Sequence, residues 1–258
     1  MPGPLTVFCQ CAHREYLSPE TRRALAASLR AAAVDLWEVR DLCEATVSDA
    51  AGLARLRAAE RVTVLACRPR AVRWLLHAGG VDMAPDRLTV VDLRTLSPEA
   101  ALHACGLTRV DGEASLPAPE PKPESWVPWF PVIDRARCTN CRQCLSFCPF
   151  GVYALSAEKR VEVRNPRQCK DNCPACARVC PELAIVFPKC PDSPIDGAEV
   201  TEADLVRRRD FAEKAMRSGG DMRALLARRR EQAARLRQRA AATADGTTSP
   251  DAERSPAR

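Results

Sequence analysis

Residues 138–149 have the sequence CTNCRQCLSFCP, and residues 169–181 have the sequence CKDNCPACARVCP. Both follow the spacing C-x2-C-x2-C-x3-C-P, except that the second copy has one extra residue in its first gap. The copies are offset by 31 or 32 residues and each is followed by a short apolar run, which indicates an internal duplication. Three closely spaced thiolates can wrap one cubane cluster, while the fourth cysteine reaches a second cluster. The spacing therefore predicts two iron–sulfur clusters.

These residues resemble the two-cluster bacterial ferredoxins over roughly sixty residues. The resemblance implies an α+β ferredoxin-like domain, expected at residues 129–194, with two [4Fe-4S] clusters and crossed ligands. One cluster would be held by Cys138, Cys141, Cys144 and Cys180. The other would be held by Cys148, Cys169, Cys173 and Cys176. The extra residue before Cys173 is the one departure from the family spacing.

Zinc is the alternative metal, because it also binds thiolates. Zinc sites usually pair two CxxC motifs, however, without the third cysteine and the Cys-Pro ending of this chain. The duplicated spacing favours iron–sulfur. A ninth cysteine, Cys190, is expected to be a buried or loop thiol without a metal.

The first hundred residues alternate between apolar, β-branched runs and Ala/Leu/Arg-rich stretches. This alternation predicts an α/β domain at residues 1–110 with a small parallel sheet. The expected strands are Leu5–Phe8, Val34–Val39, Arg61–Ala66 and Leu88–Asp92. The expected helices are Pro19–Ala33, Ser48–Ala59, Pro69–Ala78 and Pro98–Ala104, with Ser18 and Ser97 as N-caps and Gly79-Gly80 as a helix end.

Four cysteines of this domain follow predicted strands: Cys9, Cys11, Cys43 and Cys67. Ligands of open parallel sheets bind at the carboxyl ends of the strands, so these thiols are expected to converge there. Four thiolates suffice for a third [4Fe-4S] cluster or for a zinc ion. The alternative is that they are ordinary buried side chains, as is expected of Cys105.

Four short stretches of this domain also resemble the N-terminal region of the flavin-carrying subunit of heterodisulfide reductase. They are FCQC at 8–11, DLC at 41–43, LACRPR at 65–70 and VVDLR at 90–94. The resemblance implies an iron–sulfur cluster on the four cysteines named above. No GxGxxG flavin fingerprint follows a strand, so a flavin-based mechanism is not carried over.

The remaining segments are polar. Residues 111–128 are rich in Pro, Glu and Lys, which predicts an extended linker. Residues 195–243 predict a basic helical segment, and residues 244–258 a disordered tail. The segment after residue 200 has fourteen Lys or Arg against nine Asp or Glu, which suits docking to an acidic redox partner. Its stretch Met222–Ala242 has no aromatic residue, which weakens nucleic-acid and membrane-surface binding as alternatives to a solvated tail.

The chain contains no run of about 18 apolar residues and no secretion signal at its start, so a cytoplasmic protein without a membrane span is expected. No paired carboxylates or nucleophile-base motif stands out, and an enzyme acting alone is not predicted. The expected function is iron–sulfur electron transfer, as a carrier or a relay subunit of an oxidoreductase. The rival is a non-redox protein whose metal stabilises a binding surface.

Overall fold

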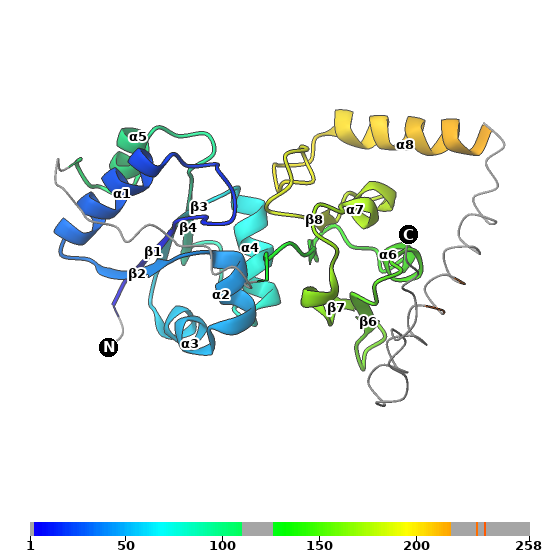
Figure 1. The fold of residues 1–258 in the computed structure, drawn as a ribbon, viewed down its shortest axis with the longest axis horizontal. Helices are drawn as coiled ribbons and strands as arrows, with labels where there is room; N and C mark the ends of the chain where they lie inside the picture. Colours follow the sequence, from blue (N-terminus) through cyan, green and yellow to red (C-terminus); the bar gives the residue numbers. More distant parts are fainter. Residues whose placement is uncertain (1–2, 110–125, 218–230, 232–234, 236–258) are drawn as a thin grey trace, which may run out of the picture.

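The computed structural model describes residues 3–109 and 126–217 together with positions 231 and 235 (Figure 1). Most of the predicted linker at 111–128, the predicted helix Met222–Ala242 apart from two positions, and the tail at 244–258 lie outside these residues. We describe an N-terminal sheet unit, residues 3–109, and a cysteine-rich unit, residues 126–200. In the described part of the chain, no helix has the length and apolarity that crossing a bilayer requires.

A four-stranded parallel sheet forms the centre of the N-terminal sheet unit, as the alternating pattern predicts. Its strands are β1 (Leu5–Cys9), β2 (Asp35–Val39), β3 (Val62–Ala66) and β4 (Leu88–Asp92), in the order β2-β1-β3-β4. Because all four run in one direction, their carboxyl ends share one edge of the sheet. From β1 the chain adds β2 on one side and then β3 and β4 on the other side, so the strand order reverses between β1 and β3. Open parallel sheets bind ligands at the carboxyl ends of the strands at such a reversal.

The helices of this unit begin at side chains that cap them. Ser18 accepts a hydrogen bond from Thr21 N before α1 (Pro19–Ala31), and Ser97 accepts one from Ala100 N before α5 (Pro98–Ala104). α4 (Pro69–Ala78) has the predicted bounds. The helix predicted at Ser48–Ala59 is confirmed as α3 (Ala50–Ala58), and a further helix that was not predicted, α2 (Leu42–Ser48), precedes it. Each is capped by an aspartate, Asp41 for α2 and Asp49 for α3.

The sheet is covered on both faces, so the unit has three layers. On one face Phe8 and Leu65 pack with Leu25, Leu29 and Leu102 of α1 and α5. The other face packs against buried residues of α2, α3 and α4. This arrangement explains why the central strands are almost continuously apolar.

The cysteine-rich unit repeats one short pattern twice, as the duplicated sequence predicts. Helices α6 (Gln143–Phe147) and α7 (Ala175–Val179) each begin inside one cysteine motif and end at its last cysteine. β5 (Val132–Ile133) pairs antiparallel with β8 (Ile185–Val186), and β6 (Tyr153–Leu155) with β7 (Val161–Val163). A 3-10 turn, Pro166–Gln168, precedes the second motif, and α8 (Glu202–Arg217) follows the unit.

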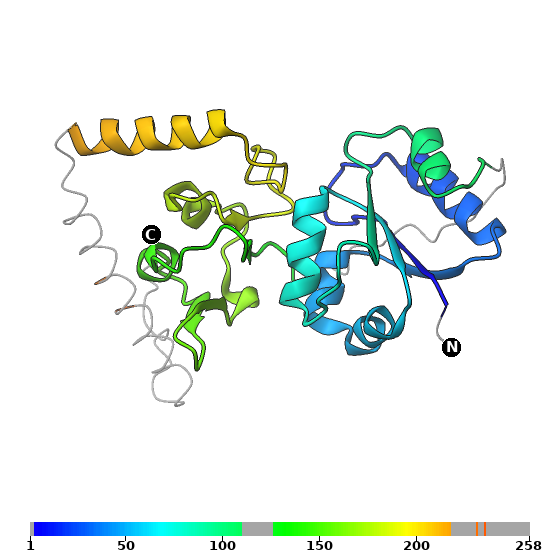
Figure 2. The ribbon, with the colours of Figure 1, turned by 180° about the vertical axis from the view of Figure 1, so that it is seen from behind.

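The two units share one core, which the polar linker did not predict. Phe130, Val132 and Val186 of the cysteine-rich unit belong to the same buried cluster as the strands and α4. Figures 1 and 2 both show α4 at the boundary, next to β5 and β8. Trp126 stacks on Phe130 at a centroid distance of 5.7 Å, on the side of this shared core. The shared core fixes how the two units face one another.

Candidate metal centres

A cavity of about 340 Å³, counted with its open mouth, lies in the cysteine-rich unit and is called cavity I here. Its thiols are Cys138, Cys141, Cys144 and Cys180, three from one motif and the fourth from the other. The loop before α6 turns tightly, because Asn140 and Arg142 both have positive φ, 60° and 64°. Asn140 also accepts a hydrogen bond from Val161 N at 2.9 Å, which fixes the loop on β7.

A second cavity of about 310 Å³, cavity II, has the reciprocal composition. Its thiols are Cys148, Cys169, Cys173 and Cys176. The extra residue of the second motif lies on the outside of this loop, since Asp171 and Asn172 are exposed. Arg14 of the N-terminal sheet unit donates to Asn172 Oδ1 at 2.5 Å. The longer loop thus contacts the N-terminal sheet unit, while Cys169 and Cys173 at its two ends line cavity II.

A third cavity of about 440 Å³, cavity III, lies at the carboxyl edge of the parallel sheet. It is lined by all four thiols of the predicted N-terminal set: Cys9, Cys11, Cys43 and Cys67. Cys9 ends β1 and Cys67 follows β3 directly, so the cavity lies where the strand order changes direction. Cys9 Sγ accepts a hydrogen bond from Leu42 N at 3.2 Å. The structure therefore brings these cysteines together.

The spacing of the thiols differs from that of a single-ion site. Among the residues that the structure describes, no three Cys, His, Asp or Glu side chains are close enough to ligate one metal ion. Zinc needs four ligand atoms at about 2.0–2.3 Å from one point. Each of cavities I to III is lined by four thiols, which is the number of ligands that a cubane cluster takes. The set of donors therefore fits a [4Fe-4S] cluster.

Burial keeps three of the thiols, Cys144, Cys169 and Cys43, protonated as long as they carry no metal. Burial raises the pKa of Cys144 to about 12, and the neighbouring thiols, Cys180 first, add to the rise. Burial and Cys148 raise the pKa of Cys169 to about 12 in the same way. In cavity III, burial raises the pKa of Cys43 to about 11. Because thiolates are the ligands, loading these cavities must release protons.

Tyr153 lines cavity II and provides a further observation on its chemistry. Its hydroxyl is buried and has no well-formed hydrogen bond within the described residues. Burial raises the pKa of Tyr153, and the sulfur atoms of Cys176 and Cys144 add to the rise. A thiolate that ligates a cluster accepts a hydrogen bond better than a thiol does, so a bound cluster would satisfy this buried hydroxyl.

The cysteine-rich unit matches known proteins. Residues 130–181 match the family model of the 4Fe-4S dicluster domain. Over 64 residues, 25% of this chain and 72% of the relative, the chain is 34% identical to the pyruvate synthase subunit PorD of Methanothermobacter marburgensis. The chain belongs to the 4Fe-4S dicluster ferredoxin family. The cysteine-rich unit, residues 126–200, contains the matched range and is called the dicluster domain from here on. This domain carries two [4Fe-4S] clusters, as the sequence predicts.

A second relative of the dicluster domain is an uncharacterized ferredoxin of Methanocaldococcus jannaschii. The two are 49% identical over 63 residues, which is 24% of this chain and 42% of that ferredoxin. The chain thus spans less than half the length of this relative. No solved structure matches the chain. Because the family match begins at residue 130, the resemblance of the N-terminal sheet unit to heterodisulfide reductase stays a prediction.

Lys189 of the dicluster domain reaches into the lining of cavity III. Its ammonium group donates to Asp41 Oδ1 at 2.8 Å and to the Pro128 carbonyl at 3.3 Å, and both charged side chains are buried. Burial opposes the charge of Lys189, but Cys43 and Asp41 outweigh this effect and raise its pKa. Lys189 is therefore charged in the folded protein.

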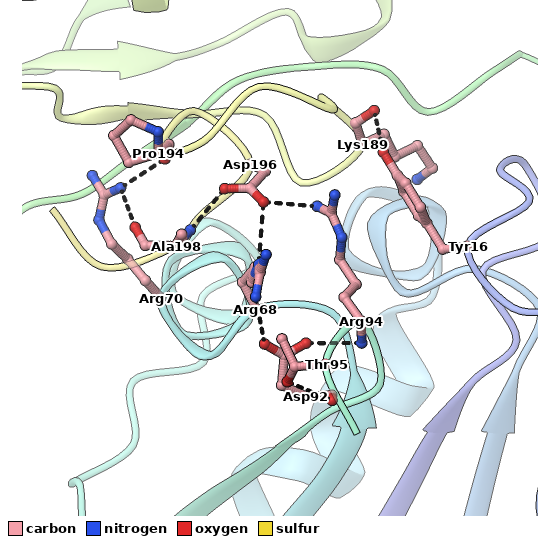
Figure 3. A network of polar contacts seen from close by, with 10 residues as sticks. All are labelled: Tyr16, Arg68, Arg70, Asp92, Arg94, Thr95, Lys189, Pro194, Asp196 and Ala198. Atoms are coloured by element: carbon pink, nitrogen blue, oxygen red, sulfur yellow. Dashed lines mark hydrogen bonds and ion pairs between the residues drawn. The ribbon is translucent and has the colours of Figure 1, made fainter. Parts of the chain in front are cut away.

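A network of ion pairs ties the dicluster domain to the same edge of the sheet (Figure 3). Arg68 donates to Asp196 at 3.1 Å and to Asp92 at 3.2 Å, and Arg94 forms an ion pair with Asp196 at 3.1 Å. Figure 3 also shows Tyr16, whose hydroxyl donates to the Lys189 carbonyl at 2.8 Å. Tyr16, Arg94 and Lys189 line cavity III, so these contacts lie beside it.

The other cysteines lie away from the three cavities. Cys190 is buried in the core of the dicluster domain and lines none of them, which confirms its prediction as a buried thiol. Cys105 is partly buried against the core under α1 and α5, as predicted. Lys189 and Asp41 were not predicted as site residues, because a lysine in a Pro-Lys-Cys-Pro stretch has no local feature that indicates a site.

Proposed function

We propose that this chain is an iron–sulfur electron-transfer protein, acting as a carrier or as a relay subunit of an oxidoreductase. The observation that supports it best is the composition of cavities I and II. Each combines three cysteines of one motif with the last cysteine of the other motif. The proposed ligands are Cys138, Cys141, Cys144 and Cys180 for one [4Fe-4S] cluster, and Cys148, Cys169, Cys173 and Cys176 for the other.

Each bound cluster supplies a centre that accepts and gives up one electron. The chain holds the sulfur ligands in apolar surroundings, with Val161 and Ile185 at cavity I and Phe150 at cavity II. Backbone amides offset negative charge on the sulfurs: Ala184 N donates to Cys180 Sγ at 3.3 Å. Burial, backbone dipoles and ligand identity are the means by which a protein sets a cluster potential.

Cavity III is proposed to hold a third centre on Cys9, Cys11, Cys43 and Cys67. Its position at the change of strand order and its four thiols support a further [4Fe-4S] cluster, with zinc as the alternative metal. The proposal includes the likeness of this unit to the N-terminal region of the heterodisulfide reductase flavin-carrying subunit. It does not include flavin chemistry, since the chain has no GxGxxG fingerprint.

The arrangement supports one order for the relay. Cys169 of cavity II packs against the core that the two units share, and Arg14, three residues after Cys11, contacts Asn172 in the loop of cavity II. These contacts support cavity II as the neighbour of cavity III. Cavity I has the exposed ligand Cys141, which suits exchange with a partner. We propose that electrons pass between cavity III and cavity I through cavity II.

The partner is proposed to be another redox protein, and the chain one subunit of a larger complex. The relative from Methanothermobacter marburgensis is named as a subunit of pyruvate synthase, which supports a subunit role here. The basic segment after residue 200 is proposed to dock an acidic partner, although most of it lies outside the described residues.

Metal analysis of anaerobically purified full-length protein tests this proposal. We expect about eight iron and eight sulfide per chain from the dicluster domain, and about twelve of each if cavity III holds a cluster. Electron paramagnetic resonance of the reduced protein should show the corresponding signals. Stoichiometric zinc without acid-labile sulfide would overturn the electron-transfer role.

A further inference from the structure

Lys189 is an unusual residue to find next to four cysteines. Its side chain is 3% exposed, and lysine is almost never buried at this level without a partner. It comes from the dicluster domain, whereas the four thiols of cavity III come from the N-terminal sheet unit. Lys189 of the dicluster domain therefore places a positive charge beside the candidate centre of the N-terminal sheet unit.

The position of this charge is fixed from two sides. Tyr16 binds the Lys189 carbonyl at 2.8 Å, and Asp41 and Pro128 bind the ammonium group. Asp41 cannot move toward Lys189 freely, because its Oδ1 also caps α2 through Glu44 N at 3.1 Å. The cation is thus held beside cavity III by contacts on both units.

Stability alone does not account for a buried pair of this kind. Replacing a buried ion pair with apolar side chains of similar size is often neutral or stabilising, because both charges lose their hydration on burial. Oδ2 of Asp41 has no hydrogen-bond partner within the described residues, so the pair is not even fully satisfied. A role in the chemistry of cavity III explains why the charge is there.

We propose that Lys189 is a positioning residue that completes cavity III from the dicluster domain and raises the reduction potential of its centre. This inference rests on the third [4Fe-4S] centre proposed above. One-electron reduction adds one negative charge to the centre, and a fixed cation nearby favours that charge by Coulomb attraction. Asp41, which lines the same cavity, has the opposite effect. Removing the charge of Lys189 and removing that of Asp41 should therefore shift the reduction potential of this centre in opposite directions.

The test is a redox titration of full-length, cluster-loaded protein followed by electron paramagnetic resonance. Lys189→Met removes the charge at similar length and should lower the potential of the cavity III centre by at least 59 mV, a tenfold change in the one-electron equilibrium. Lys189→Arg keeps the charge and should stay near the wild-type value. Asp41→Asn keeps the cap on α2 and should raise the potential. The two dicluster signals are internal controls and should not shift.

The possible outcomes distinguish this role of Lys189 from the existence of the third centre, on which it rests. Twelve iron atoms per chain with no shift in Lys189→Met would overturn the role of Lys189 and leave the third centre standing. An equal downward shift in Lys189→Arg, Lys189→Met and Asp41→Asn would also overturn it, because distortion rather than charge would then be the cause. Eight iron atoms per chain with two signals would remove the third centre, and the role of Lys189 with it. Shifts of opposite sign in Lys189→Met and Asp41→Asn would support it.

Discussion

Arg70 and Asp134 form a buried ion pair across the boundary between the two units, with Nε 2.6 Å from Oδ2 and each side chain only 4% exposed. Arg70 is the second residue of α4, and its guanidinium also donates to the Pro194 carbonyl at 3.2 Å and the Leu183 carbonyl at 2.5 Å. Asp134 precedes the first cysteine motif, and its other oxygen accepts from Ala136 N at 3.1 Å. The pair therefore links the sheet unit to the loop that leads into cavity I.

Arg70→Met should be strongly destabilising. Removing one partner of a buried pair leaves the other charge unpaired, at a cost of about 3–5 kcal/mol. We expect this loss in the free energy of unfolding, measured by denaturant titration, with faster loss of iron from cavity I. Arg55→Met is the matched control, because the Arg55–Asp35 pair at 2.7 Å is exposed and should contribute less than about 1 kcal/mol. Equal effects of the two substitutions would contradict the importance of the boundary pair.

The crossed ligand sets predict which cluster each substitution removes. Cys180→Ala should remove the cluster of cavity I, and Cys148→Ala that of cavity II, although each residue lies in the other motif. Iron analysis should show a loss of about four atoms per chain in each case. Cys190→Ala is the control, since Cys190 is equally buried but lines none of the three cavities. Loss of the cavity II signal in Cys180→Ala would show that the ligands are not crossed.

Much of the fold follows from local patterns in the sequence. The four strands and the caps at Ser18 and Ser97 depend on neighbouring residues, and the structure confirms them. Helix α3 was predicted within two residues of its bounds, whereas α2 was missed, because its seven residues are too few for a helical period to stand out.

Contacts between distant residues were less accessible to prediction. Lys189 and Asp41 are 148 positions apart, so no local pattern relates them. The shared core was missed for a similar reason: the Pro-rich composition of the linker suggested separate domains, whereas Phe130 and Val186 pack on the sheet unit. The convergence of Cys9, Cys11, Cys43 and Cys67 was predictable, since parallel strands deliver their ends to one edge.

The raised thiol pKa values predict that stability depends on pH in the metal-free protein but not in the cluster-loaded protein. In the unfolded chain a thiol loses its proton near its ordinary pKa of about 9, whereas Cys144 and Cys169 in the folded chain keep theirs up to about 12 and Cys43 up to about 11. The folded, metal-free chain therefore binds more protons than the unfolded chain between these values. Its free energy of unfolding should fall as pH rises through this window, and be fully retained below about pH 9.

Thermal unfolding at a series of pH values tests this expectation. The melting temperature of metal-free protein should decrease from about pH 9 upward, with a smaller decrease in Cys144→Ser. Cluster-loaded protein has already released these protons, so its melting temperature should lack this decrease. A flat profile for the metal-free protein over the same range would show that burial does not hold the protons on these thiols.

Gly197 lies close to α4, and a substitution there tests how tightly the two units pack against one another. Its φ is +96°, and a Cβ at this position would lie 2.4 Å from Ala71 Cβ and 2.9 Å from Ala71 N on α4. Gly197→Ala should combine a left-handed backbone cost of about 1–2 kcal/mol with an overpacking cost of about 1–3 kcal/mol. Gly106→Ala is the matched control, since Gly106 has φ +71° but open space around it, and only the backbone cost applies.

The same substitution distinguishes packing from backbone strain when it is combined with a change in its neighbour. Ala71→Gly removes the closest atom, so it should recover part of the stability that Gly197→Ala loses. Recovery should be incomplete, because the backbone nitrogen of residue 71 remains within 2.9 Å of the new Cβ. Denaturant titrations of the single and double variants give the coupling free energy directly. A coupling near zero would mean that α4 and the segment around Gly197 do not pack as closely in solution as the structure shows.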